Sequence, residues 1–152
     1  MIRAWLFLHL LGFTLWLGGG LATMIMGIAA RREDRHGLGA VVRAQGSLMK
    51  VAIAPGALIA VLSGLILTFS LSGSGGELVG FNIWLVIMQG AGLVAALLTL
   101  LISLPTATKL SRVDPTGDTA RYFDELRQRQ RIVGSISGML GLVALFAGAM
   151  LG

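Results

Sequence analysis

The chain has 152 residues, of which 55% are hydrophobic and only 12% are charged, and its mean hydropathy is +0.85. Soluble domains carry about 25% charged residues, so this composition excludes a soluble globular protein and predicts one that is integral to a membrane. The absence of cysteine excludes disulfides, thiolate metal sites and a cysteine nucleophile.

Positive charge is concentrated in two segments of the chain. Five of the twelve Lys and Arg lie in residues 31–50 and six lie in residues 109–131. Basic residues near membrane ends stay in the cytoplasm because their translocation is costly. We therefore expect 31–50 and 109–131 to be cytoplasmic loops and both termini to be external. The distribution favours contact with the lipid bilayer and predicts no binding to nucleic acid.

The first predicted membrane span covers residues 4–30 and contains a histidine, His9. At 1.5 Å per residue this segment is about 40 Å long, enough to cross a hydrocarbon core of about 30 Å. It ends in Arg31–Arg32, which is typical of a membrane anchor and not of a cleaved signal peptide. Small and aromatic residues on the His9 face admit a helix or a flat ligand. They are Trp5, Gly12, Phe13, Trp16, Gly20 and Gly27.

The second predicted span covers residues 51–71, and its helix is expected to begin earlier, within the 31–50 loop. Pro55 has no amide hydrogen and is expected to kink or loosen this helix. A small residue recurs at every fourth position, which favours close packing of another helix against this face. The stripe consists of Ala52, Gly56, Ala60 and Gly64, with Ser63 beside it.

The third predicted span, 79–108, follows a short Gly/Ser-rich external turn around Glu77. Trp84 stands where an interfacial aromatic belt is expected. Met88 and Gln89 lie inside the span near its external end, and Pro105 marks its cytoplasmic end.

The fourth predicted span, 132–151, is preceded by a helical extension that begins near Asp118. Its Gly134-xxx-Gly138 spacing is a helix-packing motif. The alternation of spans predicts a single all-α domain, a transmembrane four-helix up-down bundle.

An ionisable side chain inside a membrane span is a functional-site hypothesis, and His9 is the ionisable group in the external half of this bundle. An imidazole in an apolar pocket suits haem b, with the ring nitrogen on the iron. Trp16, Gly12 and Gly20 would then line the porphyrin, and Met88 or Gln89 would lie opposite or nearby. The alternative is a packed histidine that is hydrogen-bonded to a backbone carbonyl or to Gln89. The residue spacing leaves both interpretations open.

Four runs resemble the HemJ-type protoporphyrinogen oxidases of bacteria: LHLLGFTLWLGGG, MKVAIAPGALIAVLSGLIL, FNIWLVIM and RYFDEL. The resemblance implies a bacterial inner-membrane protein with periplasmic termini that binds haem b through His9 and oxidises protoporphyrinogen IX. The family carries a lysine, needed for activity, four residues after the tryptophan that corresponds to Trp84. Met88 stands there instead, which counts against the oxidase activity but not against haem binding. The chain also resembles small members of the copper resistance protein D group.

The leading hypothesis is a haem b-binding membrane protein that acts in porphyrin oxidation or in electron transfer to quinone. A second hypothesis is a non-catalytic subunit or assembly factor, whose glycine stripes dock helices in a homo-oligomer or a larger membrane complex. The third is copper handling by some of the seven methionines. Met24 and Met26 fall on different helical faces, which favours a packing role for them.

Overall fold

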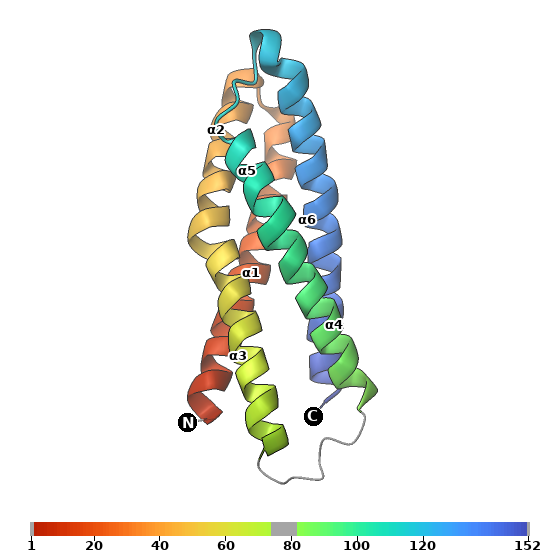
Figure 1. Ribbon diagram of the computed structural model, residues 1–152. Coiled ribbons are helices and arrows are strands. Elements are labelled where there is room, and N and C mark those ends of the chain that lie inside the picture. Colours follow the sequence, from red (N-terminus) through yellow and green to blue (C-terminus); the bar gives the residue numbers. More distant parts are fainter. Residues whose placement is uncertain (1, 74–81, 152) are drawn as a thin grey trace.

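The computed structural model describes residues 2–73 and 82–151, and the regular structure in these ranges is entirely helical. The predicted turn around Glu77 lies outside the described residues. The helices join end to end into four long rods (Figure 1). The rods are α1 (Ile2–Ala29) with the 3-10 turn η1 (Ala30–Arg32); α2 (Arg35–Leu48), the π-helix η2 (Met49–Ile53) and α3 (Ala54–Gly73); α4 (Ile83–Leu97), the π-helix η4 (Leu98–Ser103) and α5 (Leu104–Leu110); and the 3-10 turn η5 (Gly117–Thr119) with α6 (Ala120–Ala149).

The rods run alternately up and down, so both chain ends lie at one end of the bundle (Figure 1). The loops 33–34 and 111–116 lie at the opposite end, which we call the basic end because arginines cluster there. This arrangement confirms the predicted all-α four-helix up-down bundle.

All four rods are long and apolar enough to cross a membrane. Large apolar side chains point outward along them, among them Phe7, Ile25, Val51 and Leu101. Such a surface is suited to contact with lipid, so the protein has the character of a multi-pass membrane protein. The helices α2 and α6 begin at Arg35 and Ala120, inside the predicted loops, which confirms that both helices start before the segments predicted as membrane spans.

Close packing of α1 on α3 uses the predicted stripe of small residues. A Cβ atom added at Gly12 would lie 2.6 Å from the backbone nitrogen of Ala60, and one added at Gly56 would lie 2.8 Å from the carbonyl oxygen of Gly12. Neither position has room for a side chain, so the two backbones touch directly. Without a hydrophobic force between helices in lipid, such close van der Waals contact is what holds a pair together. The stripe is therefore a packing surface within the chain.

Each proline in a span lies just after a π-helical segment. Before Pro55, the N–H of Ala54 donates to the carbonyl of Met49, five residues back. Before Pro105, the N–H of Leu104 donates to the carbonyl of Thr99 in the same way. The wider turn relieves the clash between a proline ring and the carbonyl four residues earlier. The helix loosens at Pro55 as expected, and beyond Pro105 it continues as α5 to Leu110. That Pro105 marks the cytoplasmic end of the third membrane span stays a prediction.

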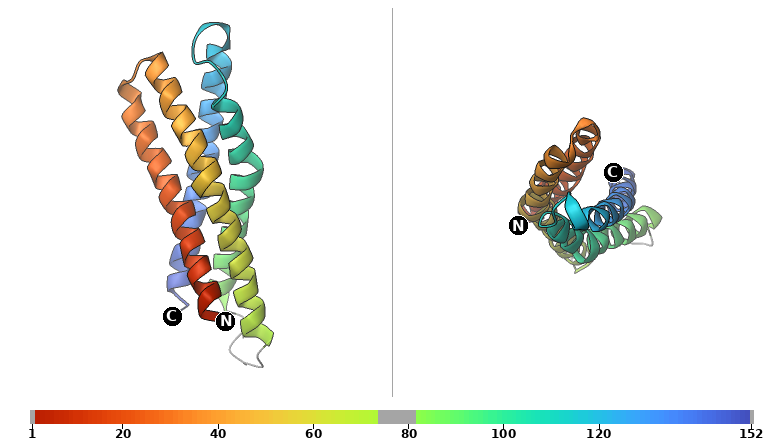
Figure 2. Two further views of the ribbon diagram at one scale, coloured as in Figure 1. Left: turned by 90° about the vertical axis from the view of Figure 1, so that its left-hand side faces the viewer. Right: turned by 90° about the horizontal axis from the view of Figure 1, so that it is seen from above.

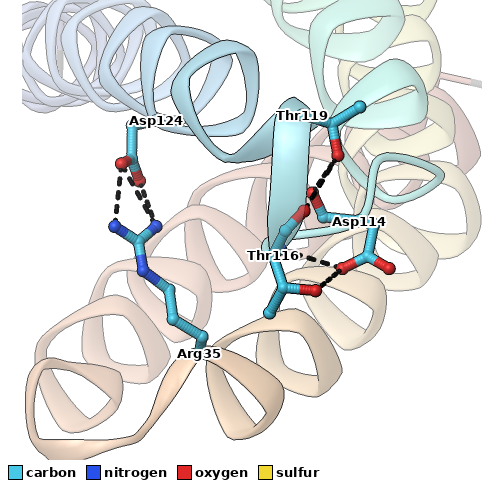
Figure 3. A network of polar contacts seen from close by, with 5 residues as sticks. All are labelled: Arg35, Asp114, Thr116, Thr119 and Asp124. Atoms are coloured by element: carbon cyan, nitrogen blue, oxygen red, sulfur yellow. Dashed lines mark hydrogen bonds and ion pairs between the residues drawn. The ribbon is translucent and has the colours of Figure 1, made fainter.

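Polar contacts join the rods at the basic end (Figure 3). The Arg35 guanidinium donates to both carboxylate oxygens of Asp124, at 2.9 and 3.1 Å, and so ties the start of α2 to α6. In the loop before η5, Asp114 accepts from the hydroxyl and the backbone N–H of Thr116 at 2.6 and 2.9 Å. These bonds hold the pKa of Asp114 below its ordinary value. The Thr119 hydroxyl closes the turn by donating to the Asp114 carbonyl at 2.8 Å.

Candidate functional site

His9 lies two turns into α1 and faces α3. Its Nδ1 atom is 2.8 Å from the carbonyl oxygen of Ala60 and 3.4 Å from the hydroxyl of Ser63. The imidazole lies over Gly64, where an added Cβ would be 3.0 Å from the ring carbon Cε1. The small-residue stripe of α3 therefore seats the imidazole as well as the α1 backbone.

The bond to Ala60 decides the tautomer of His9. A carbonyl oxygen only accepts, so Nδ1 carries the hydrogen and donates it. A neutral imidazole in this state keeps the lone pair on Nε2, which is the atom free to bind a metal or to accept a proton. Metal-binding histidines commonly donate their other ring N–H to a backbone carbonyl, because this fixes the orientation of the ring. The site thus presents one oriented imidazole nitrogen, Nε2.

A line of hydrogen bonds continues from the histidine site to Gln89 on α4. The Thr68 hydroxyl donates to the carbonyl of Gly64 at 3.0 Å, and Gln89 Nε2 donates to the Thr68 hydroxyl at 2.8 Å. Gln89 therefore bonds to α3 and reaches the site through Thr68 and Gly64. Of the two hydrogen-bond partners considered for a packed His9, the backbone carbonyl is the one that bonds to it directly.

Met88 and Gly20 lie elsewhere in the bundle. The sulfur of Met88 packs on α6, 3.2 Å from where a Cβ of Gly148 would be. Because α1 packs mainly on α3 and α4 mainly on α6, His9 and Met88 belong to different helix pairs. Gly20 is exposed, and an added Cβ there would have no atom within 4 Å. Gly20 thus opens onto the surroundings of α1.

Trp16 and Gly12 belong to the packed interior. Trp16 is only 5% exposed, and its ring meets Phe13 edge to face with centroids 6.1 Å apart. Phe13 in turn lies beside the His9 ring, with centroids 6.4 Å apart. Gly12 contacts α3 backbone directly, which leaves no width there for a ligand. Trp16 therefore packs on Phe13, and Phe13 packs beside His9.

A buried polar cluster at the centre of the bundle was not predicted from the sequence. The indole Nε1 of Trp16 donates to the hydroxyl of Thr99 at 3.2 Å, and Thr99 lies 2.7 Å from the hydroxyl of Ser137. Both hydroxyls also bond the carbonyl of Ala95. The cluster links α1, η4 and α6. The signal that could have found it is the presence of hydroxyl side chains inside two apolar spans, at Thr99 and Ser137.

Within residues 2–73 and 82–151, no group of three or more His, Asp or Glu side chains is arranged to hold a metal ion. Haem ligation makes no such demand, since one or two axial ligands suffice. No protein-family profile matches the sequence, and comparisons with curated proteins and with solved structures give no significant match.

Proposed function

We propose that this protein is a haem b-binding membrane protein, with His9 as the axial ligand. The observation that carries the proposal is the bond from His9 Nδ1 to the carbonyl of Ala60, which leaves Nε2 as the free ligand atom. The setting in an apolar helix also supports it, because an imidazole there is costly without a role.

The residues around His9 have separate roles in this proposal. Ala60 fixes the tautomer and, with Ser63, the direction of the ring, while Gly64 leaves space for the imidazole against α3. Bound haem would supply one-electron redox chemistry. Gln89 holds α3 beside α4 through Thr68, next to the site. The chain's own task is thus to bind and orient the cofactor in an apolar medium.

Two activities follow from this proposal, porphyrin oxidation and electron transfer to quinone. At position 88 a thioether stands in place of the cation that porphyrin oxidation requires in the resembling family. A thioether neither carries charge nor moves a proton. Met88 therefore favours electron transfer, with porphyrin oxidation to be tested by direct assay.

The test is the visible spectrum of protein purified in mild detergent, before and after reduction with dithionite. We expect a Soret band that sharpens, with α and β bands, on reduction. Substitution His9→Ala should reduce bound haem to background, whereas His36→Ala, which removes the exposed histidine at the basic end, should leave it unchanged. Normal haem content in a folded His9→Ala protein would refute the assignment of the ligand. A flat wild-type spectrum after expression with ample haem would refute haem binding.

One observation favours the second candidate, a non-catalytic subunit that docks partner helices. Gly134 and Gly138 of α6 are both exposed, and an added Cβ at either would have no atom within 4 Å. This motif is open to a helix of another chain, whereas the stripe on α3 is covered by α1. Substitution of both glycines by Leu should then abolish co-migration with a larger complex on native gels. A wild-type protein that migrates alone would count against this function.

A further inference from the structure

A shallow, open groove of about 640 Å³ lies along the outer face of α6, and residues of α6 alone line it, from Asp124 to Ile136. Arg127 and Arg131 line its end nearer the basic loops, and Ile132 and Ile136 line the other end. Seen from above, α1 and α6 stand apart at the basic end (Figure 2). The groove is open to the surroundings of the bundle, because most of its lining residues are exposed.

Positive charges on three elements act on Arg127, which lines this groove. Arg127 is partly buried and interacts electrostatically with Arg131 on α6, Arg35 at the start of α2 and Arg31 in η1. The Asp124 carboxylate also interacts electrostatically with Arg127 and partly offsets this positive charge. These like charges repel one another, and a bound anion would reduce the repulsion.

The carboxylate in the groove is already engaged. Asp124 receives the bidentate bond of Arg35 (Figure 3). Among the described residues, the ion pairs are this one and that of Arg121 with Glu125. Neither Arg127 nor Arg131 forms an ion pair with a carboxylate of the described residues, although both line the groove.

The character of the groove changes along the helix axis. The basic half is followed, within about 14 Å along α6, by the exposed apolar side chains of Ile132 and Ile136. The hydroxyl-bearing Ser135 lies between them. A ligand that fills this groove needs an anionic head and an apolar tail. The apolar surface of the surrounding rods also places the groove beside lipid.

We propose that this groove is a binding site for an acidic phospholipid. Arg127 and Arg131 bind its phosphate, since a guanidinium pairs with phosphate through two parallel hydrogen bonds. Its acyl chain lies on Ile132 and Ile136. The site differs from the diffuse attraction of a basic loop for anionic lipid, because it depends on two particular arginines that face one groove.

The test is a titration of the purified protein with short-chain phosphatidylglycerol, phosphatidylcholine of equal chain length, or inorganic phosphate, with Tm as the readout. We expect phosphatidylglycerol alone to raise Tm. The double substitution Arg127→Gln/Arg131→Gln should weaken its apparent affinity about thirtyfold, at roughly fivefold for each arginine. The control Arg112→Gln/Arg129→Gln removes the same charge from exposed arginines that do not line the groove, and should keep the affinity of the wild type.

Three results would overturn the proposal. An equal shift with phosphatidylcholine would show that the headgroup charge is not read. An equal shift with inorganic phosphate would show a free-anion site instead of a lipid site. Equal losses in the two double variants would reduce the effect to net charge. If the Arg127/Arg131 variant does not fold, native mass spectrometry of the wild type decides: retention of phosphatidylglycerol over phosphatidylcholine supports the site, and equal retention refutes it.

Discussion

The hydroxyl of Thr99 contacts residues of three helices, α1, α4 and α6. It accepts from the indole of Trp16, contacts Ser137 and donates to the carbonyl of Ala95 in its own helix. All of these side chains are buried. A buried polar group that loses its partner costs about 1–3 kcal/mol, so this cluster fixes the relative positions of the helices that contribute to it.

Substitution Thr99→Val tests the cluster with little change in shape. It leaves the Trp16 N–H and the Ser137 hydroxyl with fewer partners, so we expect the free energy of unfolding to fall by about 1–2 kcal/mol. The measurement is denaturation by SDS in mixed micelles. The control is Thr14→Val, because the Thr14 hydroxyl is exposed and bonds only to Leu10 of its own helix. Equal stability of the two variants would show that the cluster contributes nothing.

At the scale of elements, the contact between α1 and α3 positions His9. Gly12, three residues after His9, lies against the backbone of α3 at Ala60, the residue whose carbonyl orients the imidazole. The separation of the two helices therefore also sets the geometry of the histidine site. Any residue that pushes them apart lengthens the bond from Nδ1.

Substitution Gly12→Ala should disturb this contact. The new Cβ would lie 2.6 Å from backbone, which cannot move aside as a flexible side chain does. Overpacking costs about 1–3 kcal/mol, more than the roughly 1 kcal/mol that alanine gains over glycine in a helix. The matched control is Gly20→Ala, in open space on the same helix, which should be neutral or stabilising in the same denaturation assay. A Gly12→Ala protein as stable as this control would contradict the close contact.

At the scale of the whole molecule, the bundle consists of two helix pairs, α1 with α3 and α4 with α6. Toward the chain ends α3 and α4 diverge, while the basic end collects the loops and the phospholipid groove (Figure 1). The two candidate sites thus lie near opposite ends, with the Thr99 cluster between them. A protein with this layout has a polar head at one end and its histidine near the other.

The orientation of this layout in the membrane is a prediction of the charge distribution. Reporters fused to either chain end should read the same side, because both ends lie together (Figure 1). We expect this side to be external, so that a periplasm-active reporter placed after Gly152 is active. A reporter inserted in the 111–116 loop should read the opposite side. A cytoplasmic signal from the C-terminal fusion would reverse the predicted orientation.

Four long helices, their up-down order and the early start of α2 and α6 were predictable from the sequence. Backbone polar groups in lipid must be satisfied within each segment, so a long uncharged run can only be a helix.

Which helix faces pack against each other could not be predicted from the sequence. The tertiary structure placed Met88 on α6, turned Gly20 outward and directed Trp16 to Thr99. Lipid tails are as apolar as leucine, so hydrophobic periodicity does not distinguish a face that meets lipid from one that meets a helix. That choice depends on the fit of small residues across two helices, such as Gly12 against Ala60, and on hydrogen bonds between segments far apart in the chain.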